Sequence, residues 1–120
     1  MDTRSKILTL AAALQLRPPV ALVTGYFDVL RVGDARELAR VRHHPLLVVV
    51  LPVAGEILPP RARAEMVAAL RVVDYVVTAD HADAEKLIES LKPVEFVRLE
   101  PADAHRTRQL IEHVHRRQTS

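Results

Sequence analysis

The sequence predicts a single α/β domain built on a parallel sheet of four or five strands flanked by helices. Short apolar runs rich in Val and Leu alternate along the 120 residues with segments whose apolar residues recur at helical spacing. This alternation is typical of a parallel sheet that helices cover on both faces through right-handed crossovers. No internal repeat, low-complexity tract or second domain is visible. We therefore expect one Rossmann-like domain over residues 1–120.

The first half of the chain is predicted to contain a helix, a strand, a helix and a strand, at residues 3–16, 20–23, 35–42 and 46–51. The first helix has an apolar face at i, i+3, i+4, i+7 spacing, and Arg17-Pro18-Pro19 ends it. Both strands are apolar enough to be buried on both faces. Asp34 and Glu37 form a D-x-x-E pattern close to a capping box, so Asp34 is the expected N-cap of the second helix.

The second half is predicted to add, in order, a helix at 61–71, a strand at 72–78, a helix from Asp80 or Asp83, a strand at 93–99, and a last helix after Pro101 and Asp103. Pro59-Pro60 provides the start of the first of these helices, because proline is favoured in a first helical turn. The last helix has Leu110, Ile111 and Val114 as its apolar face.

Composition excludes several classes of protein. With 17 Lys and Arg against 15 Asp and Glu, the net charge is only +2, and the arginines are dispersed, so no nucleic-acid binding is expected. The absence of cysteine excludes disulfides, thiolate metal sites and cysteine nucleophiles. No apolar run approaches the roughly 18–20 residues that span a membrane, and no signal-peptide pattern is present. We expect a cytoplasmic protein that does not engage a membrane.

The stretch that joins the first strand to the following helix has the features of an anion site. Thr24 and Gly25 follow the predicted strand, Gly25 lets the chain turn, and Gly33 and Asp34 open the helix. Unpaired N–H groups and the positive end of the helix dipole would face one pocket there. In parallel sheets, ligands bind beyond the carboxyl ends of the strands, where this loop is expected to lie.

This stretch also carries a family resemblance. Residues 25–34, Gly-Tyr-Phe-Asp-x-x-Arg-x-Gly-Asp, resemble the G-x-F-D-x-x-H-x-G-H signature of the cytidylyltransferase-like nucleotidyltransferases. Residues 63–77 are similar to the R-A-E-x-x-A-A-L-x-x-V-D-Y-V-V stretch of the glycerol-phosphate and heptose-phosphate members, and residues 91–97 to their L-K-P-D-x-x-V strand. The resemblance runs from about residue 6 to residue 116 and implies a homodimer with a site for a nucleotide or phosphorylated small molecule. It implies nucleotide-binding roles for Thr24, Gly25, Tyr26, Phe27, Gly33, Arg63 and Thr107.

The chain departs from the family at the catalytic positions. Both signature histidines are replaced, by Arg31 and Asp34. In the family these histidines lie against the nucleotide phosphates and stabilise the charge that develops as pyrophosphate leaves. Arg31 can still donate to a phosphate, whereas the Asp34 carboxylate repels one and, as an N-cap, satisfies helix N–H groups that phosphate would use. The segments after the second and fourth strands are also shorter than in the family, and Thr107 alone remains of its Ser/Thr-rich phosphate motif.

Each candidate residue has a structural interpretation beside the functional one. Asp34 is expected to be an ordinary N-cap, and Arg31 is either a solvated loop residue or a phosphate ligand. Arg63 either binds an anion or forms a salt bridge on the helix surface, and Thr107 is favoured as a helix-start residue over a phosphate ligand. Phe27 is expected to pack in the core and Asp28 to support the loop. The six histidines lack metal-binding spacing, so no protein-ligated metal is expected.

The leading prediction is a degenerate member of the nucleotidyltransferase family, catalytically weak or inactive, that serves as a ligand-binding or interaction module without a cofactor. The alternative is an active cytidylyltransferase or adenylyltransferase with a site rebuilt from Arg31, Arg63 and Thr107. Such an enzyme would need Mg²⁺ with its nucleoside triphosphate and would transfer a nucleotidyl group to a sugar- or polyol-phosphate, releasing pyrophosphate. A third interpretation is a structural subunit whose partner supplies the chemistry.

Overall fold

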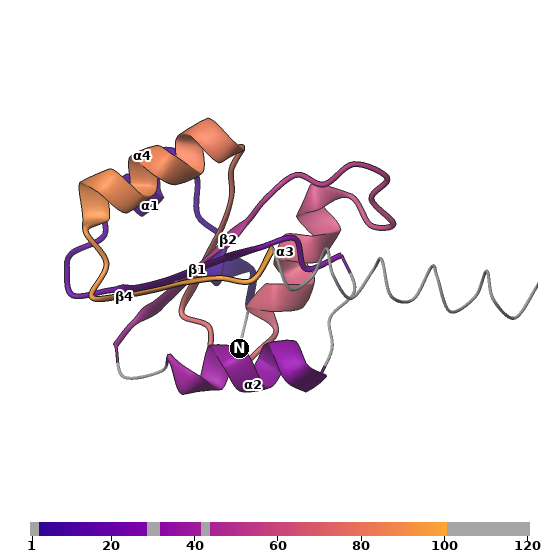
Figure 1. The fold of residues 1–120 in the computed structure, drawn as a ribbon, viewed down its shortest axis with the longest axis horizontal. Coiled ribbons are helices and arrows are strands. Elements are labelled where there is room, and N and C mark those ends of the chain that lie inside the picture. Colours follow the sequence, from indigo (N-terminus) through magenta and orange to yellow (C-terminus); the bar gives the residue numbers. More distant parts are fainter. Residues whose placement is uncertain (1–2, 29–31, 42–43, 101–120) are drawn as a thin grey trace, which may run out of the picture.

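A four-stranded parallel sheet with helices on both faces forms the protein (Figure 1). The computed structural model describes residues 3–28, 32–41 and 44–100. The strands are β1 (Ala21–Gly25), β2 (Leu46–Val50), β3 (Tyr75–Thr78) and β4 (Glu95–Arg98), and their order across the sheet is β3-β2-β1-β4. The helices are the 3₁₀ helix η1 (Thr3–Lys6) and the α-helices α1 (Leu10–Leu14), α2 (Val32–Arg40), α3 (Pro60–Ala68) and α4 (His81–Leu91). The predicted α/β fold class with a parallel sheet is confirmed.

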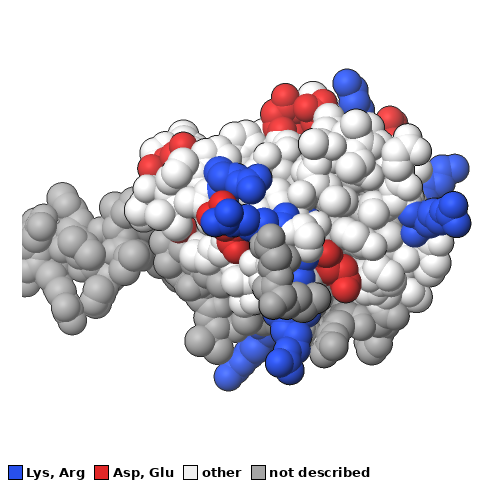
Figure 2. Space-filling view, turned by 180° about the vertical axis from the view of Figure 1, so that it is seen from behind, with Lys and Arg blue, Asp and Glu red and all other residues white. Residues whose placement is uncertain are grey.

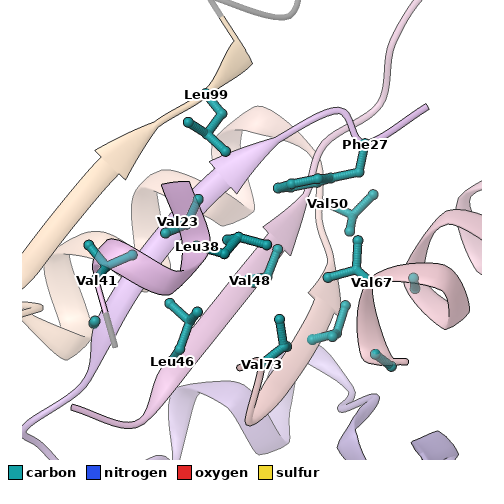
Figure 3. Packing of buried hydrophobic residues seen from close by; sticks show 14 residues of the cluster. Val23, Phe27, Leu38, Val41, Leu46, Val48, Val50, Val67, Val73 and Leu99 are labelled. Atoms are coloured by element: carbon teal, nitrogen blue, oxygen red, sulfur yellow. The ribbon is translucent and has the colours of Figure 1, made fainter. Parts of the chain in front are cut away.

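The two central strands explain why the sheet needs cover on both sides. Every residue of β1 and β2 is buried, and alternate side chains enter one of two separate cores. On one face, α2 and α3 pack on the sheet, and Leu38 of α2 lies over Val23 and Val48 (Figure 3). On the other face, α1 and α4 contribute Ala13 and Leu87 to the second core.

The N-terminal segment differs from the predicted single helix over residues 3–16. It consists of η1, an extended step at Ile7 and the short helix α1, which Thr9 caps by accepting a hydrogen bond from the Ala12 N–H at 3.1 Å. Ile7 forms a parallel bridge with Val76 at the outer side of β3 and packs in the α2–α3 core. Leu10, by contrast, packs in the α1–α4 core. The segment therefore crosses the edge of the sheet, and one helix could not serve both faces.

Helix starts agree with the sequence at two positions and differ at a third. Pro59 is the N-cap of α3 with Pro60 at its first position, and Asp80 caps α4 by accepting from the Asp83 N–H at 2.7 Å. Helix α2 begins at Val32, so Asp34 lies within its first turn, and its prediction as the N-cap is wrong. The predicted last helix lies outside the described residues.

Surface charge and helix length bear on what the protein can contact. In the view of Figure 2, basic and acidic side chains are dispersed in small groups, some of them next to each other, with uncharged surface between them. None of the helices in the described ranges is long and apolar enough to cross a membrane.

Candidate functional site

The carboxyl ends of β2 and β3 form one wall of a pocket. It has a volume of about 280 Å³ and is lined by Val50, Pro52, Pro60, Arg63, Thr78, Ala79, Asp80 and Asp83. The N-terminal turns of α3 and α4 supply the other wall, as expected where parallel strands lead into helices. Two carboxylates, on Asp80 and Asp83, are therefore present at a position where this class of fold binds ligands.

Arg63 is the most unusual residue of this region, because its charged side chain is 0% exposed. Its Nη1 donates to the backbone carbonyls of Tyr26 and Leu51, each at 2.8 Å, and its Nη2 donates to Glu56 Oε2 at 2.8 Å. The Nε atom is buried and has no hydrogen-bond partner in the described part of the chain. Arg63 thereby joins the segments that follow β1 and β2. Of its two predicted interpretations, the structure shows the salt bridge, to Glu56, although the arginine is buried and not on the helix surface. Anion binding by Arg63 stays a prediction.

Asp28 makes a second connection between the same two segments. Its carboxylate accepts hydrogen bonds from the backbone N–H of Ile57 at 2.7 Å and of Leu58 at 2.8 Å. The role predicted for Asp28, support of the loop, is confirmed. Together, Asp28 and Arg63 hold the loop at residues 52–58 against the end of β1.

Gly25 and Phe27 shape the turn between these contacts. Phe27 is buried, as predicted, with a φ of +53°, and its ring lies beside Val50 in the core (Figure 3). A Cβ atom placed on Gly25 would lie 2.7 Å from Cε2 of that ring, well inside van der Waals contact. Gly25 is therefore required for packing in the described conformation, whatever its part in ligand binding.

Polar contacts also join residues at the carboxyl ends of β1 and β4. The Oγ1 of Thr24, which is fully buried, donates to Glu100 Oε2 at 2.8 Å. Arg98 pairs with Glu85 at 2.9 Å and with Glu100 at 3.5 Å, and its guanidinium lies 4.8 Å from the centre of the Phe96 ring. The hydrogen bond that Arg98 donates to Glu85 is the main cause that raises the pKa of Arg98 above its ordinary value.

The predicted site residues thus fall into three groups. The first group lies together at the carboxyl ends of the strands, and each of its members packs or forms hydrogen bonds within the chain. It consists of Thr24, Gly25, Tyr26, Phe27 and Arg63. Gly33 and Asp34 belong to the first turn of α2, and their side-chain surroundings are not described. Arg31 and Thr107 lie outside the described residues.

Three residues of the site were not predicted as such. Glu56 is the carboxylate partner of Arg63, and its distance from the signature along the chain gave no signal. The sequence predicts Asp80 and Asp83 only as helix caps, although their place after the third strand puts them at the ligand-binding edge of a parallel sheet. Among the described residues, no three His, Asp or Glu side chains gather closely enough to hold a metal ion.

Comparison with known proteins adds to this geometry. No protein-family model matches the chain, and no curated protein sequence matches it. A solved structure that matches is that of the lipopolysaccharide core biosynthesis protein from Thermoplasma volcanium GSS1, with a TM-score of 0.58. The two chains share a fold. The match covers 67% of this chain and 94% of the other, at 21% sequence identity, so the likeness extends to the arrangement of strands and helices and not to activity.

Proposed function

We propose that this protein is a degenerate nucleotidyltransferase-fold protein, catalytically weak or inactive, that serves as a ligand-binding or interaction module. Two independent observations support membership of this group. Three sequence blocks resemble the cytidylyltransferase-like family, and the fold is shared with a lipopolysaccharide core biosynthesis protein. The contacts at the strand ends support the loss of activity.

The observation that carries the proposal is the engagement of Arg63 by the protein itself. An arginine that binds phosphate offers two parallel N–H donors to the ligand oxygens. Here both Nη atoms already donate to acceptors within the chain, and the side chain is fully buried. A phosphate that accepts from Nη2 of Arg63 would first have to displace the Glu56 carboxylate, which already accepts from it at 2.8 Å.

The charge of the pocket points in the same direction. Asp80 and Asp83 line it, and a polyanion such as a nucleoside triphosphate is repelled by two nearby carboxylates. Both signature histidines, which would supply donors toward the leaving pyrophosphate, are absent from the sequence. The pocket suits a small ligand that is neutral or positively charged better than a triphosphate.

A thermal-shift panel with CTP, ATP, CDP and inorganic phosphate, each with and without Mg²⁺, tests the proposal. A ligand with a Kd of about 1 mM stabilises the protein by only about 0.4 kcal/mol at 1 mM, whereas a Kd of about 10 µM gives about 2.7 kcal/mol. We expect the smaller effect for every triphosphate, and no pyrophosphate release with sugar- or polyol-phosphate acceptors. Micromolar CTP or ATP binding together with turnover would establish the alternative, an active nucleotidyltransferase.

A pair of variants tests the part assigned to Glu56. Glu56→Gln removes the charge that competes for Arg63, so inorganic phosphate should bind about fivefold more tightly, a gain of about 1 kcal/mol. The matched control is Glu65→Gln, which removes a carboxylate paired at 3.2 Å with the exposed Arg61 on the same helix as Arg63. Equal phosphate affinity in the two variants would show that Glu56 does not compete with anions.

A further inference from the structure

The two outer edges of the sheet are treated differently by the chain. At β3 the edge is covered by the N-terminal segment, because Ile7 bridges to Val76 and the Leu8 N–H donates to the Val76 carbonyl at 2.7 Å. Strand β4 pairs with β1 on its inner side, and no strand of the described ranges pairs with its outer side. An uncovered edge presents backbone N–H and C=O groups that can pair with another strand.

A groove runs along this edge between β4 and the C-terminal half of α2. It has a volume of about 360 Å³ and is lined by Glu37, Arg40, Val41, Glu95, Phe96 and Val97. Residues that point to both faces of the sheet line it, since Phe96 packs with one core and Val97 with the other. The groove therefore gives access to the strand edge itself.

The groove contains charges that the chain does not fully satisfy. The Oε2 atom of Glu95 is buried and has no hydrogen-bond partner in the part of the chain that the structure describes. Arg40 lines the same groove but pairs instead with Glu37, at 3.2 Å, through a side chain that is 76% exposed. A buried carboxylate oxygen without a partner is costly, so the site favours an occupant that brings a cation.

We propose that β4 pairs in an antiparallel manner with β4 of a second copy of this chain, so that two four-stranded sheets become one. Antiparallel pairing of identical strands requires a two-fold axis perpendicular to the sheet, which is the symmetry of an isologous dimer. This axis brings both α2 helices to the same face of the joined sheet. Each copy then offers its exposed Arg40 toward the Glu37 and Glu95 carboxylates of the other.

Charge selects a second copy over an unrelated strand. An inward-pointing Glu95 opposes pairing with any strand that brings no cation, which is how natural edges avoid indiscriminate association. The same copy that supplies β4 also supplies Arg40, so the interface is complementary to itself. Pairing would also cover Val94, which precedes β4 and is 52% exposed.

Sedimentation of the full chain over a concentration series tests the interface, with Arg40→Glu as the disrupting variant. We expect a dimer whose dissociation constant rises by about tenfold or more in Arg40→Glu. The control, Arg61→Glu, makes the same charge change and removes the same kind of intrahelical pair, on α3, and should change dissociation by less than about twofold. A strict monomer at about 100 µM, or equal effects of the two variants, would overturn the proposal.

Disulfide cross-linking locates the contact directly, because the chain has no cysteine of its own. The two-fold axis passes near the middle of β4, so either Phe96→Cys or Val97→Cys should form a covalent dimer under mild oxidation. Glu89→Cys, at an exposed position of α4, measures collisional cross-linking. Failure of both β4 variants to exceed this control would place the interface elsewhere and refute the pairing.

Discussion

Replacement of Arg63 by methionine should destabilise the protein far more than its position on a helix suggests. The substitution keeps an unbranched apolar stem but removes three hydrogen bonds of 2.8 Å from a charged donor. It leaves the Tyr26 and Leu51 carbonyls without this donor, and one of these bonds is wholly buried. Leaving a buried acceptor without its donor costs about 1–3 kcal/mol, so the two carbonyls together give about 2–6 kcal/mol. We expect a loss in that range, a large part of the roughly 5–15 kcal/mol that stabilises a domain.

Arg63→Lys and Glu56→Gln divide this loss into its parts. Lysine keeps the charge but lacks the planar fork that reaches two carbonyls and a carboxylate at once, so we expect a loss of about 1–2 kcal/mol. Glu56 is 39% exposed at its side chain, and glutamine can still accept from Nη2. The salt bridge is therefore screened by water, and Glu56→Gln should cost less than about 1 kcal/mol. If the two carbonyls are the main acceptors, the loss of stability should be largest for Arg63→Met, smaller for Arg63→Lys and smallest for Glu56→Gln.

Urea denaturation followed by circular dichroism measures these differences. Arg61→Met is the control, because Arg61 lies two residues earlier on α3 with a side chain 63% exposed and one intrahelical pair. It should cost less than about 0.5 kcal/mol. An Arg63→Met loss below about 1 kcal/mol would refute the structural role of Arg63 and restore it as a candidate anion ligand.

Three further predictions address the turn, a helix cap and the signature. Gly25→Ala should cost about 1–3 kcal/mol of stability in chemical denaturation, because its Cβ meets the Phe27 ring at 2.7 Å. Phe27→Leu in the same chain should recover part of that loss. If the stability losses of the two substitutions simply add, the contact is contradicted. Asp80→Ala should cost about 0.5–2 kcal/mol of stability, whereas Asp80→Asn should cost close to none, because Asn accepts from the helix N–H equally well. Similar losses of stability in the two variants would show that the charge of Asp80 matters and its capping does not. Asp34→Asn removes a negative charge from the first turn of α2 and should tighten triphosphate binding by about 1–2 kcal/mol in calorimetry at low salt. The gain should shrink as salt rises, and no gain at any salt would show that shape rather than charge limits binding.

Local chemistry explains which elements the sequence predicted well. The buried run of β2 is apolar at every position, and in β1 Thr24 is the one polar residue. Such near-continuous apolar runs are typical of central parallel strands. Proline at the start of α3 and aspartate before α4 act on the helix turns next to them, so their effect can be inferred without knowledge of the fold.

The N-terminal segment shows where periodicity fails. Ile7 and Leu10 have the spacing of one helix face, yet they pack in different cores on opposite sides of the sheet. Their separation depends on the bridge between Ile7 and Val76, 69 residues apart in the sequence. The predicted start of α2 at Ala35 lies three residues after its observed start at Val32, because sequence patterns define the ends of a helix less well than its position.

The burial of Arg63 and its hydrogen-bond acceptors could not be predicted from its neighbours in the sequence. On a surface helix an arginine at this spacing is ordinarily solvated, and burial of the charge depends on acceptors from two distant segments. Glu56 completes the arrangement from a loop with no recognisable motif. Contacts of this kind come from the tertiary fold, so the candidate site was less predictable than the strands around it.

The connections made by Arg63 and Asp28 have a consequence for how such a signature persists over evolutionary time. Four residues that match the family pattern are held in place by packing or hydrogen bonds of the folded protein: Gly25, Phe27, Asp28 and Arg63. Selection for folding alone would keep them, whereas it exerts no comparable pressure on a histidine whose task is to meet a leaving pyrophosphate. A lineage that abandons the reaction can therefore lose its two histidines and still display the rest of the signature.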